Sequence, residues 1–147
     1  MGKRRKARES TLQILFQLEF DDSDPEGIVD RFWKERKTPQ EVEEYSRLLV
    51  KGIISRREII DRIIQSASQH WRLSRMAIVD RNILRLAVFE LCFGKDLAPA
   101  IVINESIEIA KKFSSEQAAR FINGILDALR RQPHKIQEIM KEDSHGK

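Results

Sequence analysis

Apolar residues recur every three or four positions along nearly the whole chain. This spacing places them on one face of an α-helix, and no stretch of useful length shows the alternation typical of a β-strand. Proline and glycine are few and fall mostly between the periodic segments. The sequence therefore predicts an all-α fold of about seven helices.

The first predicted helix, from about residue 5 to residue 20, is apolar on two opposite sides. One stripe consists of Ala7, Thr11, Ile14 and Leu18, and the other of Leu12, Phe16 and Phe20. A helix with two apolar faces is usually packed between other elements. We therefore expect two three-helix subdomains that are joined through this central N-terminal helix.

Breaks in the apolar pattern divide the rest of the chain into shorter helices. One helix is expected to begin at Pro25, and a shift of the stripe near Ser55 separates a third helix from a fourth. The fifth helix should cover about 76–93 and the sixth about 99–113.

The last predicted helix follows a capping signal. Ser114 precedes Gln117 by three residues, which is the spacing of a capping box. This helix should end near residue 132, before Pro133. The residues after it are polar, so we expect a helical domain over 1–132 and a flexible C-terminal tail over 133–147.

The composition is typical of a soluble globular protein. A chain of 147 residues suits one domain, and 34% of its residues are charged. No apolar stretch is long enough to span a bilayer, and no signal-type apolar core follows the basic start. The single cysteine, Cys92, lies in an apolar run and gives no disulfide framework, which fits a reducing compartment. A cytoplasmic location is expected.

Positive charge is concentrated at the N-terminus, although the formal net charge is only +4. The basic residues of this arm are Lys3, Arg4, Arg5, Lys6 and Arg8. A run of basic residues that leads into a helix can bind phosphates, and arginine can also stack on bases. On composition alone, a solubilising tail explains the same residues equally well.

The sequence contains no recognisable catalytic or metal-binding pattern. The three histidines do not stand at ligand spacing with the lone cysteine, and there is no glycine-rich phosphate loop. Residues 22–26 resemble the beginning of a calcium loop, but the twelfth position is Trp33 where a bidentate Glu is required. We therefore expect no enzyme activity, no cofactor and no metal.

Two polar regions of the later helices are candidates for ligand contact. Phe121 lies at the edge of an apolar stripe, beside Gly124 and within reach of Arg120, and it could stack an unpaired base or belong to the core. Gly124 inside a helix costs about 1 kcal/mol relative to Ala, which close helix packing or an approaching RNA would explain. Asp80, Arg81 and Arg85 lie on or near one side of the fifth predicted helix and could form a surface ion-pair ladder of little energy.

Two sets of motifs give the chain a resemblance to a known family. The first set is WRL at 71–73, DRNILRLA at 80–87 and FEL at 89–91, and the second is INESIEIAKKF at 103–113 and FINGILD at 121–127. Together with the basic start, they resemble the NusB-type transcription antitermination factor family. The resemblance covers nearly the whole length.

The resemblance implies a binding function without an active site. Such proteins bind the single-stranded boxA element of nascent transcripts, chiefly ribosomal RNA leaders, together with the ribosomal small-subunit protein NusE in the RNA polymerase antitermination complex. By resemblance, the RNA-binding residues are Arg4, Arg5, Lys6, Arg8, Gln117, Arg120 and Phe121. Asp80 is implied to contact NusE, since an acid suits a basic ribosomal protein.

The chain departs from the family's pattern at two of these positions. Lys6 stands where the family has arginine, and it keeps the charge but loses the planar fork. Gln117 stands where the family often has an acid. That change removes a charge that would repel RNA, so RNA binding is expected to depend less on the partner.

Two alternatives remain open at this point. A NusB-like domain also forms the N-terminal part of some ribosomal RNA cytosine methyltransferases, so the chain could be a stand-alone RNA-binding domain of that kind. No cofactor-binding Rossmann segment is present, which argues against a methyltransferase itself. The other alternative is a non-enzymatic helical protein-interaction scaffold, which would show no salt-dependent RNA affinity.

Overall fold

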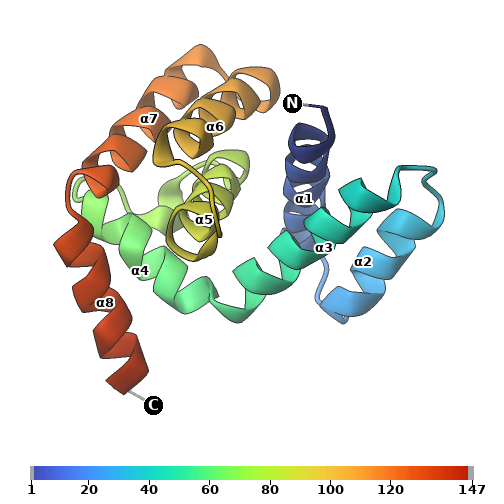
Figure 1. The fold of residues 1–147 in the computed structure, drawn as a ribbon, viewed down its shortest axis with the longest axis horizontal. Coiled ribbons are helices and arrows are strands. Elements are labelled where there is room, and N and C mark those ends of the chain that lie inside the picture. Colours follow the sequence, from blue (N-terminus) through green and yellow to red (C-terminus); the bar gives the residue numbers. More distant parts are fainter. Residues whose placement is uncertain (1, 146–147) are drawn as a thin grey trace. The chain divides into compact units, whose positions relative to one another are not determined.

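The computed structural model describes residues 2–145, and the regular structure in that range is entirely helical (Figure 1). Its elements are α1 (Gly2–Phe20), α2 (Pro25–Lys34), α3 (Gln40–Ser55), α4 (Arg57–Ala67), the 3₁₀ turn η1 (Leu73–Arg75), α5 (Ile78–Phe93), α6 (Pro99–Phe113), α7 (Glu116–Arg130) and α8 (Pro133–His145). The predicted all-α fold is confirmed, with one α-helix more than the seven expected.

The chain divides into two compact units, Met1–Ser55 and Arg56–Lys147. The boundary coincides with the break predicted near Ser55, where α3 ends and α4 begins two residues later. The first unit contains α1 to α3, as a three-helix subdomain should. The second contains α4 to α8 and η1, so it is larger than expected. The role of α1 as a joining helix stays a prediction.

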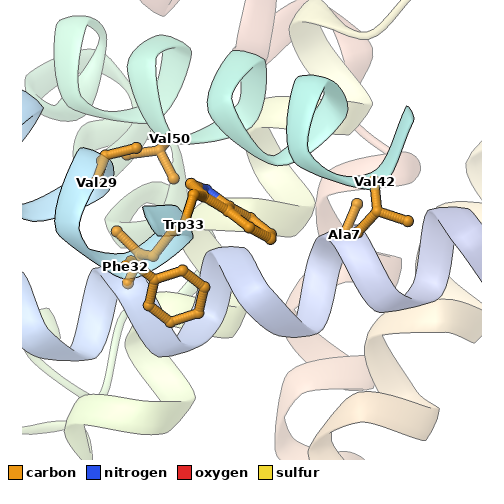
Figure 2. Packing of buried hydrophobic residues seen from close by; sticks show 7 residues of the cluster. Ala7, Val29, Phe32, Trp33, Val42 and Val50 are labelled. Carbon is orange, nitrogen blue, oxygen red and sulfur yellow. The ribbon is translucent and has the colours of Figure 1, made fainter. Parts of the chain in front are cut away.

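The core of the first unit is formed by α1, α2 and α3. Figure 2 shows Phe32 and Trp33 of α2 pointing between α1 and α3, and their rings meet edge to face with centroids 5.0 Å apart. Thr11 of α1 is buried with them, and its hydroxyl donates to the Ala7 carbonyl at 2.8 Å and is hydrogen-bonded to Ser46 Oγ at 2.8 Å. Thr11, the polar member of the predicted stripe, therefore has its hydroxyl hydrogen-bonded inside the core.

The opposite stripe of α1 is only partly buried. Leu12 is buried, but Phe16 and Phe20 are 42% and 67% exposed. Their two rings pack against each other edge to face, 5.1 Å apart. Leu15, which belongs to neither predicted stripe, is buried instead. The second apolar face of α1 therefore ends earlier than its sequence pattern indicates.

Helix α5 is the central element of the second unit. It contacts α4, α6 and α7, and its residues from Asn82 to Glu90 are all buried. A helix buried on every side needs apolar residues all round, with its polar groups paired inside. Much of the motif at 80–91 therefore maintains the fold and is not surface available to a ligand.

The segment predicted to be a flexible tail is largely helical. Helix α8 packs against α4, where Lys135 Nζ donates to the Ser66 carbonyl at 3.1 Å and Arg62 pairs with Glu142 at 2.6 Å. Its half-buried apolar residues recur at helical spacing, namely Ile136, Ile139 and Met140. The flexible-tail expectation overlooked this short stripe, and residues 146–147 lie outside the described range. The domain boundary at residue 132 stays a prediction.

Candidate nucleic-acid interface

The basic N-terminal residues belong to the first turns of α1 and do not form an extended arm before it. Arg4 and Lys6 are exposed, and Arg5 is half-buried. The Arg4 guanidinium lies over the Tyr45 ring, 3.8 Å from its centroid, and Lys3 Nζ pairs with Glu41 at 3.1 Å. Stacking on an aromatic ring restricts the motion of a guanidinium and leaves its N–H edge able to donate hydrogen bonds.

Arg8 differs from the other basic residues of this helix. Its side chain faces the buried side of α1, and the residue is only 3% exposed. A charge buried to this extent is held by interactions inside the protein and is not available at the surface. We therefore leave Arg8 out of the candidate interface, although the sequence placed it there.

The candidate residues on α7 form one strip along the helix. Gln117, Arg120, Phe121 and Gly124 follow one another at the spacing of a single helix face. Gln117, Arg120 and Gly124 are exposed, and Phe121 is half-buried. The structure therefore places the three RNA-contact candidates of the second unit on one face of α7, with Phe121 next to Arg120 in sequence and one turn after Gln117.

Gly124 leaves bare backbone at one end of this strip. A Cβ atom added at Gly124 would meet nothing within 4 Å. Close helix packing therefore does not explain why a glycine stands in this helix. The other explanation considered from the sequence, close approach of a ligand, is compatible with the open space.

The start of α7 corrects the predicted capping box. The N-cap is Ser115 and not Ser114, and its Oγ accepts a hydrogen bond from the backbone N–H of Ala118 at 3.0 Å. Gln117 is consequently the second residue of the helix and not the third. The predicted pairing between Ser114 and Gln117 is therefore wrong by one residue, because both serines fit the same local signal.

Asp80 is the third residue of α5 and is half-buried. Its Oδ1 atom is buried and has no hydrogen-bond partner among the described residues. A carboxylate in the first turn is favoured by the helix dipole. A buried carboxylate oxygen without a protein partner calls for an ordered water or a local rearrangement and does not by itself mark a contact with another protein.

The candidates are divided between the two units. Arg4, Arg5 and Lys6 lie in the first unit, whereas Asp80 and the α7 strip lie in the second. Sequence reasoning missed Tyr45, the ring beneath Arg4. No local pattern indicated it, because the two residues are far apart in the chain and only the packing of α1 on α3 brings them together.

Other kinds of site are not seen in the described part of the chain. Residues 2–145 contain no group of three or more His, Cys, Asp or Glu side chains arranged to hold a metal ion. None of the helices in this range combines the length and the apolar character needed to cross a membrane.

Comparison with known proteins gives matches along most of the chain. The model of the NusB family matches residues 5–131. A transcription antitermination protein NusB from Syntrophus aciditrophicus (strain SB) is 42% identical over 135 residues, which cover 92% of this chain and 84% of the relative. The protein of the same name from Desulfitobacterium hafniense (strain DSM 10664 / DCB-2) is 40% identical over 145 residues, which cover 97% and 94%.

Solved structures are similar to the chain as well. The antitermination factors NusB and NusE have been crystallised in complex with double-stranded RNA, and one chain of that complex superposes with a TM-score of 0.79 at 30% identity, covering 89% of this chain and 98% of its own length. The structure of T. maritima NusB gives a TM-score of 0.79 at 38% identity, covering 92% and 96%.

Proposed function

The chain belongs to the NusB family, and on this premise we propose that it is a transcription antitermination factor that binds RNA together with NusE. The observation that carries the proposal is its similarity to the solved complex of NusB, NusE and RNA. The proposed ligand is boxA-type single-stranded RNA of ribosomal RNA leader transcripts. The proposed setting is the RNA polymerase antitermination complex in the cytoplasm, with no enzymatic step and no cofactor.

In this proposal the N-terminal basic residues supply sequence-independent affinity. Arg4, Arg5 and Lys6 approach the RNA backbone, and each phosphate contact releases counterions from the strand. The support is the surface position of Arg4 and Lys6 and the stacking of Arg4 on Tyr45. A preorganised guanidinium loses less side-chain entropy when it binds a phosphate.

The α7 strip supplies the base contacts. Phe121 stacks on an unpaired base, while Gln117 and Arg120, which precede it on the same helix face, reach base edges or phosphates. The support is the common helix face, the half-exposed ring and the open backbone at Gly124. Single-stranded RNA is proposed because a base that is already paired and stacked cannot lie on a side-chain ring.

Asp80 is proposed to contact NusE. The support is the half-exposed position of this acid in the first turn of α5. A basic partner would neutralise this charge, and electrostatic complementarity of this kind speeds association.

The function is tested by anisotropy titrations of the full chain with labelled boxA-like RNA, single-stranded and double-stranded, with and without NusE. Replacing Arg4, Arg5 and Lys6 by Ala should lower affinity and flatten the log–log salt slope by about 2, because each single-strand phosphate contact contributes roughly 0.7. The matched control replaces three exposed lysines of the same unit, Lys34, Lys37 and Lys51. If both triple variants behave alike, the basic residues of α1 have no special role.

Phe121→Leu tests the base contact separately. The substitution keeps most of the apolar contact and removes the aromatic face. Stacking is worth about 1–3 kcal/mol per base, so affinity should fall about 5- to 150-fold while the melting temperature changes little. A destabilised variant with normal RNA affinity would assign Phe121 to the core. If the wild-type chain shows no salt-dependent RNA affinity, the scaffold alternative is favoured. If NusE does not change the RNA affinity, a stand-alone RNA-binding domain is favoured.

A further inference from the structure

A recess on the second unit is lined mainly by arginines. It lies among α4, η1 and α5, has a volume of about 730 Å³, and its charged lining residues are Arg57, Asp61, Arg62, Arg72, Arg81 and Arg85. Asp61 is the only carboxylate among the described residues that line it. We call this the arginine recess.

The single carboxylate is already engaged by a buried arginine. Arg85, whose side chain is 6% exposed, donates from Nε to Asp61 Oδ1 at 2.8 Å and from Nη2 to Asp61 Oδ2 at 3.1 Å. Its Nη1 also donates to Asn82 Oδ1 at 3.1 Å. This bidentate pair neutralises one arginine and fixes the position of Arg85 in the lining of the recess.

The lining of the recess carries an excess of positive charge, with five arginines and one carboxylate. Arg62 pairs with Glu142 of α8, Arg57 Nε lies 3.9 Å from Asp61 Oδ2, and Arg81 Nη1 donates to the Ser74 carbonyl at 3.4 Å. Guanidinium groups gathered around one hollow form a surface suited to phosphate groups, which accept planar, two-pronged hydrogen bonds.

The loop that carries the recess residue Arg72 also carries Trp71, and side-chain hydrogen bonds hold its backbone. The Gln65 side-chain amide donates from Nε2 to the carbonyls of Ser68 and Trp71, both at 2.8 Å, and its Oε1 accepts from the backbone N–H of Leu73 at 2.9 Å. Ser68 Oγ donates to the Trp71 carbonyl at 2.9 Å. The backbone of the loop is therefore fixed by side chains, although it lies outside the α-helices.

Trp71 is nevertheless 57% exposed. A large indole held at the surface by an ordered backbone, next in sequence to the recess residue Arg72, is not explained by packing. Aromatic rings interleaved with basic side chains are the usual surface for single-stranded nucleic acid, because every base has a face that can stack.

From this juxtaposition we propose that the arginine recess binds the sugar–phosphate backbone of single-stranded RNA while Trp71 stacks on one of its bases. The inference rests on the proposed RNA-binding function and adds a second RNA-binding surface within the second unit. Arg57, Arg72 and Arg81 provide phosphate contacts, and Gln65 acts as a positioning residue for the loop. An acidic protein would satisfy the arginines but would give no base to stack on Trp71, so RNA is the better match.

Tryptophan fluorescence reports directly on the stacking contact. The chain has two tryptophans, and the other one, Trp33, is 3% exposed in the core of the first unit. Titration with unlabelled boxA-like RNA that carries flanking nucleotides should quench the exposed emission. Trp71→Phe should abolish the quenching with little loss of affinity, whereas Trp71→Leu should lower affinity about 5- to 150-fold.

The phosphate contacts are tested by charge removal with a matched control. Arg57→Gln combined with Arg72→Gln should reduce the log–log salt slope by about 1.4, which corresponds to two single-strand phosphate contacts. Arg75→Gln combined with Arg130→Gln removes the same charge from exposed positions of the second unit that do not line the recess. The control slope should remain close to that of the wild type.

The outcomes separate this inference from the proposed function. If the α1 triple variant loses RNA affinity while the recess variants match their control, the inference is overturned and the proposed function stands. Loss of binding to a polyglutamate peptide with unchanged RNA binding would assign the recess to an acidic protein and also overturn the inference. A selective loss of RNA affinity and of Trp71 quenching supports it.

Discussion

Replacement of Gly124 by Ala should stabilise the protein and weaken its binding to RNA. Gly124 lies inside α7 with negative φ, and the added Cβ would have no atom within 4 Å. No clash offsets the gain in helix propensity, so the free energy of unfolding should rise by about 1 kcal/mol. For a chain of this size that gain corresponds to about 2–4 °C in melting temperature.

The same methyl group would stand between α7 and an RNA backbone that approaches the strip beside Phe121. If the contact is as close as the proposed function requires, overpacking it by one methyl group costs about 1–3 kcal/mol, or about 5- to 150-fold in affinity. We therefore expect stability to rise and RNA affinity to fall in the same variant. A glycine without an RNA contact would change the stability alone.

Thermal unfolding followed by circular dichroism and anisotropy titration with boxA-like RNA measure the two effects. Gly27→Ala is the matched control, since Gly27 also lies in a helix with open space at its Cβ position. It should stabilise the chain by a similar or smaller amount and leave RNA affinity unchanged. An unchanged or lower melting temperature for Gly124→Ala would refute the reasoning about open space. Undiminished affinity would show that RNA does not approach this strip.

Three further predictions concern single side chains. Ser115→Ala should destabilise α7 by about 1 kcal/mol in urea unfolding, whereas Ser114→Ala should have little effect, because only Ser115 caps the helix. Asp80→Lys should slow association with NusE in surface plasmon resonance and leave RNA binding by the isolated chain intact; an unaltered on-rate would place the partner surface elsewhere. Burial raises the pKa of the Cys92 thiol to about 11 from its ordinary 9.0, so the unfolded thiol ionises first and stability should fall as pH rises through this window. Cys92→Ala should remove this part of the loss, seen by comparing urea unfolding at about pH 8 and about pH 10 with the wild type.

The positions of the helices were predictable from the sequence because helix formation is governed by a local pattern. The break near Ser55 and the limits of α6 agree with the structure, since each depends on residues within one or two turns. The motifs that resemble the NusB family correctly indicated the family. The same local reasoning failed where two signals were equivalent, as at Ser114 and Ser115, or where an apolar stripe was short, as in α8.

Which side of each helix is covered was decided only by the tertiary structure. The apolar pattern of α1 extends to Phe20, but burial also requires a neighbour, and Phe20 has little cover. In the same way Arg8 and Arg4 look alike in sequence, yet one is buried and the other is stacked on Tyr45 at the surface.

The arginine recess has the same origin. Its charges come from α4, the loop before η1, and α5, and the pair between Asp61 and Arg85 forms only when these elements pack together. Local periodicity therefore determined the helices, and the motifs indicated the family. Contacts between residues distant in the chain decided which arginines are exposed, which rings are stacked and where the surface is hollow. Burial and electrostatic pairing depend on distances in space, and no local pattern contains these distances.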